Sequence, residues 1–319
     1  MYDLTIAIPT IGRSEHLEKM LNKLIPACYG NNIEVLVSDN ASVDGTKALL
    51  NNFKKQAFFR SLRSENHLSF DENVLKLLGE VRGKFVWLLG DDDDIDFLFF
   101  DQIIDLVRER SDIGIFFLSF IYPHKNAHKK EENSLKIEEI SSREYLDVYL
   151  HKATLISSNI INMKYFYDIK LNSETISKEW IQVQILIKIL ELLNRHKKNV
   201  LIVKTEVIFP AVGNTNYSFK KFWSTFVDQF SFVVDRSSQS LDLVRFKKNF
   251  YRLNLRRRFL TIGRDFCWAR VFPIYKFVAV YFYISLYDKI LFWLSFIIFR
   301  VFSYSSLKKM KDFVLRERK

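Results

Sequence analysis

Residues 85–94 of this chain read Phe85-Val86-Trp87-Leu88-Leu89-Gly90-Asp91-Asp92-Asp93-Asp94. The apolar part predicts a buried β-strand, because it is short, holds aromatic and branched side chains and ends at a glycine. Carboxylates gathered directly after a buried strand are costly unless a cation or solvent compensates their charge. A hard divalent ion such as Mg²⁺ or Mn²⁺ suits them and is typically shared with substrate phosphates. The run therefore predicts a metal and phosphate site, and the alternative is a solvated acidic turn at a helix N-terminus.

Three further apolar runs predict strands, at residues 4–8, 33–37 and 113–120. Segments of helical periodicity separate the strands, and the predicted helix caps are Ser14, Ser69 and Ser141. Strands that alternate with helices predict an α/β fold, with a mostly parallel sheet that carries helices on both faces. Polar clusters follow three of the strands, at residues 9–13, 38–46 and 90–94. Because ligands bind beyond the carboxyl ends of such strands, we predict that these clusters line one edge of the sheet.

Four motifs resemble those of family 2 glycosyltransferases in order and spacing. They are Ile6-Ala7-Ile8-Pro9-Thr10-Ile11-Gly12-Arg13, then Val37-Ser38-Asp39-Asn40-Ala41-Ser42-Val43-Asp44-Gly45-Thr46, then Asn66 followed by Asn73, and finally Phe85 through Asp93. Together they are far more specific than any one motif alone. The segment from Leu89 to Asp93 is similar to the abequosyltransferase-type branch, which builds bacterial surface polysaccharides. One position departs from the family, which usually has an aspartate where this chain has Gly90.

The resemblance implies the GT-A fold, a Rossmann-like arrangement that binds nucleotide-diphosphate sugars. It implies as donor-binding residues Pro9, Thr10, Arg13, Asp39, Asn66, Asn73, Asp91 and Asp92. Asp39 would accept the ring N–H of a uracil or thymine base, and the expected donor is a UDP-sugar, or a dTDP- or CDP-sugar. Asp92 and Asp93 would bind Mn²⁺ or Mg²⁺. Asp91 or Asp93 could replace the carboxylate that is missing at Gly90, so the aspartate that contacts the metal stays open.

The implied reaction is an inverting transfer of the sugar to a hydroxyl. A single in-line displacement of this kind needs a carboxylate that takes the proton from the attacking hydroxyl. The resemblance implies Glu179 as the base, because it directly precedes Trp180 and the predicted helix to Leu193, about where the family places its catalytic carboxylate; Glu174 is the reserve. The alternative is that Glu179 only stabilises the helix N-terminus through the helix dipole.

The acceptor implied by the resemblance is a glycan, expected to be lipid-linked, in lipopolysaccharide O-antigen or capsule synthesis. A transferase of the same fold that acts on a polyprenyl phosphate is one alternative, since an anionic acceptor needs no base. A non-catalytic module whose basic, aromatic tail binds nucleic acid is the alternative from another class. The chain contains no Gly-rich dinucleotide fingerprint and no Walker loop, which argues against a redox or ATP enzyme.

Charge divides the chain unevenly. Residues 241–319 hold 18 Lys and Arg against five Asp and Glu, whereas residues 1–240 hold 30 basic and 32 acidic residues. We therefore predict a glycosyltransferase domain at 1–240 and a basic, aromatic helical tail at 241–319. The uncharged runs 277–287 and 290–299 are each shorter than the roughly 20 residues of a membrane span. An interfacial position on anionic lipid is therefore favoured over a span, and the other alternative is packing on the domain or on a second copy.

Cysteine and histidine usage excludes several other classes. The chain has two cysteines, Cys28 and Cys267, too few for a disulfide framework or a four-Cys zinc site. The histidines at 124, 128 and 151 lack zinc-ligand spacing and are expected at the surface. The segment Met1-Tyr2-Asp3-Leu4 has no signal-peptide pattern, so we expect a cytoplasmic protein, peripheral on the cytoplasmic membrane.

Overall fold

The computed structural model describes residues 1–122, 133–171, 179–211, 224–238 and 240–256, together with residues 286, 289, 290, 293 and 294. The chain divides into two compact units. The first comprises Met1–Thr215 and Phe232–Leu241, and the second comprises Asn216–Ser231 and Asp242–Lys319.

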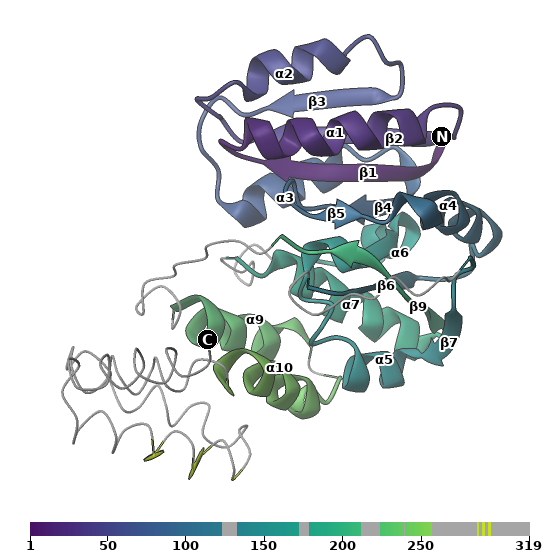
Figure 1. Cartoon of the computed structure of the whole chain (residues 1–319). Helices are drawn as coiled ribbons and strands as arrows, with labels where there is room; N and C mark the ends of the chain where they lie inside the picture. Colours follow the sequence, from purple (N-terminus) through teal and green to yellow (C-terminus); the bar gives the residue numbers. More distant parts are fainter. Residues whose placement is uncertain are drawn as a thin grey trace, which may run out of the picture. The chain divides into compact units, whose positions relative to one another are not determined.

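The first unit is built on one mixed sheet, whose strand order is β3-β2-β1-β4-β8-β6-β9-β5, with β7 also beside β9 (Figure 1). The N-terminal strands are parallel and are β1 (Tyr2–Thr10), β2 (Ile33–Asp39), β3 (Phe59–Arg63) and β4 (Gly83–Leu88). Antiparallel β8 (Asn159–Asn162) lies between β4 and β6 (Ile115–Phe120). β9 (Asn199–Phe209) runs parallel to β6, and both β5 (Asp94–Ile95) and β7 (Ile137–Ser141) pair antiparallel to β9. The predicted α/β sheet is confirmed, and antiparallel strands complete its second half.

Helices cover both faces of this sheet, as the alternating pattern predicts. The helices of the first unit are α1 (Ser14–Cys28), α2 (Thr46–Phe53), α3 (Phe70–Gly79), α4 (Phe100–Glu109), α5 (Ser142–Val148), α6 (Met163–Asp168) and α7 (Ile181–Arg195). Alternate residues of β1, namely Leu4, Ile6 and Ile8, belong to one buried cluster with apolar residues of α1, α2 and α4. Helix α3 contacts β1, β2 and α7, and α7 also contacts α5 and α6.

Local caps decide where these helices begin. The predicted capping box is confirmed: the Glu72 amide donates to the Ser69 hydroxyl, and the Ser69 amide donates to the Glu72 carboxylate over 2.8 Å. Ser141 caps α5 as predicted. The prediction that Ser14 caps α1 is wrong, because Ser14 is already helical and Arg13 is the N-cap residue. The Ser14 amide instead donates to Asp44, which a different loop supplies.

In the second unit, the described part is a small helical cluster. A π-helical turn at Ser224–Gln229 leads into α9 (Phe230–Ser237), which begins in this unit, and α10 spans Val244–Arg256. The rings of Phe230 and Phe250 stack with centroids 3.5 Å apart, and Phe246 packs edge-on against Phe230. Most of the predicted tail lies outside the described residues. Within the described parts of the chain, no helix is long and apolar enough to cross a membrane.

Candidate functional site

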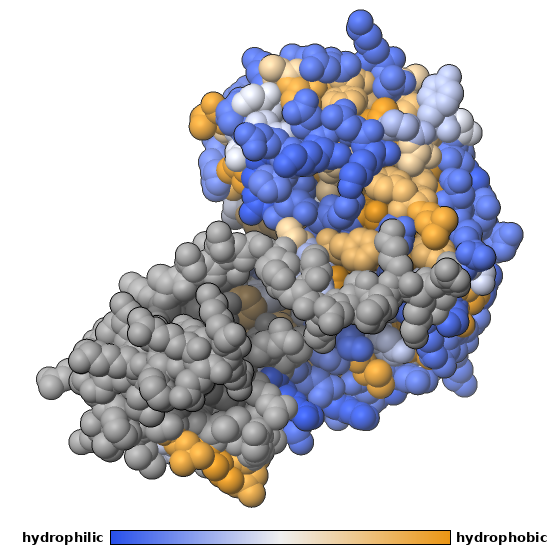
Figure 2. Space-filling view, viewed as in Figure 1, coloured by the Kyte–Doolittle hydropathy of each residue, from blue (hydrophilic) through white to orange (hydrophobic). Residues whose placement is uncertain are grey.

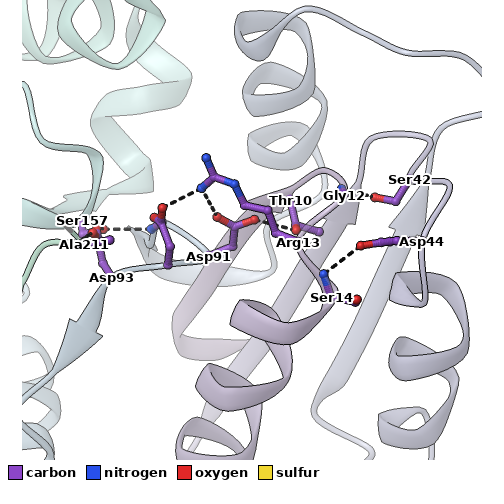
Figure 3. A network of polar contacts seen from close by, with 12 residues as sticks. Thr10, Gly12, Arg13, Ser14, Ser42, Asp44, Asp91, Asp93, Ser157 and Ala211 are labelled. Atoms are coloured by element: carbon purple, nitrogen blue, oxygen red, sulfur yellow. Dashed lines mark hydrogen bonds and ion pairs between the residues drawn. The ribbon is translucent and has the colours of Figure 1, made fainter. Parts of the chain in front are cut away.

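Three strand ends bring the predicted polar clusters to one edge of the sheet. β1 and β2 are parallel and in register, so that Thr10 lies opposite Asp39. The Thr10 hydroxyl donates to Asp91 over 2.7 Å, which joins the first cluster to the acidic run (Figure 3). The Gly12 amide donates to the Ser42 hydroxyl over 2.9 Å, which joins it to the second cluster. The predicted convergence of the clusters is confirmed.

Arg13 holds two of the four aspartates. Its guanidinium lies 3.0 Å from Asp91 and 2.7 Å from Asp92 (Figure 3). Burial raises the pKa of Asp91, although the Thr10 hydrogen bond and the Arg13 charge oppose this shift. Burial acts to lower the pKa of Arg13, but the two carboxylates outweigh it and raise that pKa. The two aspartates therefore share one positive group at the edge of the sheet.

Asp93 points to a different part of the domain. Its carboxylate accepts hydrogen bonds from the Ser157 hydroxyl and, over 2.9 Å, from the Ala211 amide. Ser157 also accepts from the Gly90 amide over 2.8 Å, so the acidic loop is fastened to the chain just before β8. Burial raises the pKa of Asp93 despite these hydrogen bonds. A Cβ atom placed on Gly90 would lie 2.9 Å from the Asp93 carboxylate oxygen, so this carboxylate fills the space that a side chain at position 90 would enter.

Asp39 is fully buried at the end of β2, and its carboxylate contacts an arginine that the sequence analysis missed. It accepts a hydrogen bond from the Ser42 amide over 2.9 Å and forms an ion pair with Arg63. Arg63 also donates to the Ser42 carbonyl over 2.8 Å. The sequence offers no signal for it, because its strand β3 is not among the predicted strands; the structure places Arg63 at the end of β3, opposite Asp39. Asp39 and Arg63 together form a polar corner at this edge of the sheet.

The remaining predicted donor residues are dispersed around this corner. Asn73 is buried in α3, where it accepts a hydrogen bond from the Ser38 hydroxyl over 2.7 Å. Asn66 is exposed, and Pro9 is half-buried in β1. These three residues are therefore less directly linked to the site than the other predicted donor residues, which are Thr10, Arg13, Asp39, Asp91 and Asp92.

Glu179 is exposed and directly precedes Trp180, the N-cap residue of α7. Its amide donates to the Asp71 carboxylate of α3 over 3.0 Å. The start of α3 is in turn joined to the end of β2, because Asn40 exchanges two 2.8 Å hydrogen bonds with the backbone of Leu68. These contacts connect Glu179 to the edge that carries the acidic run. Glu174 lies outside the described residues.

The described residues contain no group of three or more His, Cys, Asp or Glu side chains arranged around a metal position. Mg²⁺ does not require such a cage, since it keeps several waters and binds through one or two carboxylates and substrate phosphates. Asp91 and Asp92 meet that requirement, because their carboxylates already converge on one cation, the Arg13 guanidinium. The Asp92 side chain is 27% exposed against 7% for Asp91, so Asp92 is the more accessible carboxylate.

Comparisons with known proteins identify proteins of similar sequence and fold. Abequosyltransferase RfbV of Salmonella typhimurium is 34% identical over 95 residues, a match that spans 28% of this chain and 28% of that protein. The structure of S. aureus TarS 1–349 has a TM-score of 0.57 at 15% identity and covers 84% of this chain and 75% of that one. Mannosyltransferase PcManGT from Pyrobaculum calidifontis, solved with GDP-Man and Mn²⁺, has a TM-score of 0.55 at 13% identity, covering 98% and 85%.

At these identities the solved structures establish the GT-A fold alone. The sequence profile of Glycosyl transferase family 2 matches residues 5–166, which is half of the chain and includes most of β1, all of β4 and the acidic loop. This chain belongs to glycosyl transferase family 2.

Proposed function

We propose that the protein is an inverting glycosyltransferase that moves a sugar from a nucleotide-diphosphate donor to an acceptor hydroxyl. The observation that carries the proposal is the meeting of Asp39 and the Asp91–Asp92 pair, from separate strand ends, at one edge of the sheet. Structures of TarS with UDP and with UDP-GlcNAc, which share the fold, support a nucleotide-sugar donor.

The corner formed by Asp39 and Arg63 is the proposed base-binding site. A buried carboxylate can accept the ring N–H of uracil or thymine, so a UDP- or dTDP-sugar is favoured. A CDP-sugar is the other candidate, because cytosine has no ring N–H but can donate from its amino group. Arg63 is 40% exposed and can remain paired with Asp39 while it offers a planar cation to the base or ribose. Thr10, Arg13 and Asp91 would then lie toward the diphosphate.

Asp92, with Asp91 beside it, would hold Mn²⁺ or Mg²⁺. When bound, the cation supplies positive charge against the diphosphate leaving group. Arg13 contributes a second positive group at the same position. Asp93 is a less suitable ligand than the sequence predicts, because its carboxylate already fastens the loop to Ser157 and Ala211.

Glu179 is the proposed general base. The acceptor oxygen forms a bond to the anomeric carbon while the bond from that carbon to the diphosphate oxygen breaks, and the hydroxyl proton passes to the Glu179 carboxylate. The position has the backbone strain that often marks functional residues, since Glu179 adopts a φ of 92°.

A thermal-shift panel of UDP, dTDP, CDP and GDP, with and without Mn²⁺, tests the donor and metal roles. A ligand at about 100 times its Kd stabilises the folded protein by about 2.7 kcal/mol. For a domain of this size that corresponds to a rise in Tm of about 5–10 °C. We expect a Mn²⁺-dependent rise with one pyrimidine diphosphate, and its loss in Asp92→Ala.

Asp94→Ala is the matched control, because Asp94 lies in the same acidic run but is exposed and pairs with Lys23. Equal shifts in both variants, or a shift that needs no cation, would contradict the metal role. Retention on RNA without any nucleotide shift would instead favour the nucleic-acid-binding alternative.

For the acceptor, we propose a lipid-linked glycan of bacterial surface polysaccharide, and a peripheral position on the cytoplasmic membrane. The partial match to an abequosyltransferase and the basic tail support this. Leu286, Ile290, Trp293 and Leu294 are 44–73% exposed and follow the spacing of one helix face. Hydrophobic atoms also form an orange group at the lower edge of Figure 2.

Flotation with anionic liposomes at low salt tests the membrane proposal. We expect the protein to float with the vesicles, and Leu294→Glu should weaken flotation because it places a charge on this apolar face. The control is Tyr29→Glu, which adds the same charge at a residue of the first unit that is 76% exposed. If both variants float like the unchanged protein, this face does not contact lipid.

Turnover of Glu179→Gln separates the two acceptor classes. Loss of turnover with unchanged nucleotide binding supports a hydroxyl acceptor, which needs a base. Near-normal turnover supports a polyprenyl phosphate acceptor, which is already anionic.

A further inference from the structure

One buried carboxylate joins α3 to the segment that carries Glu179. Asp71 is 1% exposed and lies in the first turn of α3. Its Oδ2 atom accepts the Glu179 amide over 3.0 Å, and its Oδ1 atom accepts the Ile181 amide over 3.3 Å. The two oxygens therefore hold the backbone on both sides of Trp180, although Asp71 is about 110 residues away in sequence.

This contact supplies the cap of α7. The N-cap residue of α7 is Trp180, whose indole ring can donate but cannot accept a hydrogen bond. The Ile181 amide is one of the first amides of the helix, which have no partner within the helix itself. Asp71 accepts it from another helix, and a negative charge at this end is also favoured by the helix dipole.

The same carboxylate holds Glu179 in an unfavourable backbone conformation. Its φ of 92° lies in the left-handed region, which side chains with a Cβ atom rarely adopt. Such a conformation persists where the surrounding structure holds it in place. The Asp71 bond to the Glu179 amide is one such restraint, and φ sets the direction in which the Glu179 side chain leaves the backbone.

We propose that Asp71 is a positioning residue for Glu179: it fixes the backbone at Glu179 and so aims the catalytic carboxylate at the acceptor. The inference rests on the proposed function, in which Glu179 is the base. Asp71 itself acts only through the backbone and takes no proton.

A double-mutant cycle of Asp71→Asn and Glu179→Gln tests this role. The probe is nucleoside diphosphate release from a panel of UDP-, dTDP-, CDP- and GDP-sugars with Mn²⁺, using water as acceptor and the donor that is turned over fastest. Displacing a catalytic group by about 1 Å can cost about 100-fold in rate. We expect Asp71→Asn to lower kcat by about 10- to 100-fold with the donor KM within twofold, and to lower it no further in the Glu179→Gln background.

The control is Glu72→Gln, which removes a neighbouring exposed acid from the same helix turn and should leave kcat within twofold. If Asp71→Asn fails to fold, as judged by loss of a cooperative thermal unfolding transition, Asp71→Ser replaces it, since a hydroxyl still accepts one amide. Normal kcat in Asp71→Asn overturns the positioning role of Asp71 but leaves the proposed function standing. The same holds if Asp71→Asn lowers kcat by the same factor with and without Glu179→Gln. Normal kcat in Glu179→Gln overturns the base assignment and the inference with it.

Discussion

Replacing Gly90 with alanine tests how the acidic loop is held. The backbone of Gly90 is outside the left-handed region, so an alanine there is not strained by its conformation. Its Cβ atom would, however, lie 2.9 Å from Oδ2 and 3.3 Å from Cγ of Asp93, and 3.4 Å from the Ser157 hydroxyl. The Asp93 carboxylate must therefore move, and the hydrogen bond that the Ser157 hydroxyl donates to Oδ2 is the contact that weakens.

The cost follows from the contact that is lost. A hydrogen bond to a charged group contributes about 1.5–3 kcal/mol. A Gly-to-Ala change also stabilises the protein by about 0.4–1 kcal/mol, because alanine lowers the conformational entropy of the unfolded chain. We expect Gly90→Ala to lower the free energy of unfolding by about 1–2 kcal/mol, which is a fall in Tm of about 2–8 °C for a domain of this size.

The assay is urea unfolding of four proteins: the unchanged chain, Gly90→Ala, Asp93→Ala and the double variant. In the Asp93→Ala background the clash is gone, so Gly90→Ala should be neutral or slightly stabilising. A coupling energy of about 1.5–3 kcal/mol is expected, within the range for residues in contact. An equal cost of Gly90→Ala in both backgrounds would refute the reasoning.

Three further predictions concern single side chains. Glu179→Gly should lower turnover, because it removes the proposed base, and should raise the Tm. The glycine relieves left-handed strain of about 1–3 kcal/mol, which exceeds the cost of about 0.5–1 kcal/mol for the added entropy of the unfolded chain. Thermal melts showing a lower Tm would contradict this. Arg63→Ala should weaken UDP binding by about 10-fold in calorimetry, because Asp39 loses its ion pair. An unchanged affinity would show that Arg63 does not contribute to nucleotide binding. His151, expected at the surface, is half-buried in the structure. This burial, with a smaller contribution from Lys152, lowers the pKa of His151 to about 4. The folded state favours neutral His151, so the contribution of this residue to the free energy of unfolding is present above about pH 6.5 and is lost as the pH falls toward 4. Thermal melts across that range should show a smaller fall in Tm for His151→Gln than for the unchanged protein. Equal falls in Tm for the two proteins would contradict this prediction.

The parallel half of the sheet could be predicted because its signals are local. β1, β2 and β4 contain short apolar runs, the helices α1 and α3 that follow strands carry apolar faces, and parallel strands end at the same edge. β3 is the exception, because its sequence Phe59-Arg60-Ser61-Leu62-Arg63 has no apolar run, and it is not among the predicted strands. Thr10 and Asp91 are 81 positions apart, yet that argument places them together, and the structure joins them by a hydrogen bond.

The antiparallel half could not be predicted in the same way. β8 has four residues and runs in reverse between β4 and β6, and β5 has two residues. Segments this short carry little periodicity, so their pairing depends on partners distant in sequence. The same reason explains the missed cap of α1, where Asp44 on another loop accepts the Ser14 amide.

The four aspartates show most clearly what a sequence leaves undetermined. In the sequence they are equivalent neighbours, but each contacts a different part of the chain: Asp91 pairs with Thr10 and Arg13, Asp92 with Arg13, Asp93 with Ser157 and Ala211, and Asp94 with Lys23. These partners come from β1, from α1 and its N-cap residue, from the turn before β8 and from the segment after β9. A carboxylate that already accepts buried hydrogen bonds is costly to redirect toward a ligand, because its donors would be left unsatisfied. Among Asp91, Asp92 and Asp93, Asp92 has the fewest such donors and is the most exposed, so its surroundings, and not its place in the motif, are the reason we propose it as the carboxylate that binds the cation.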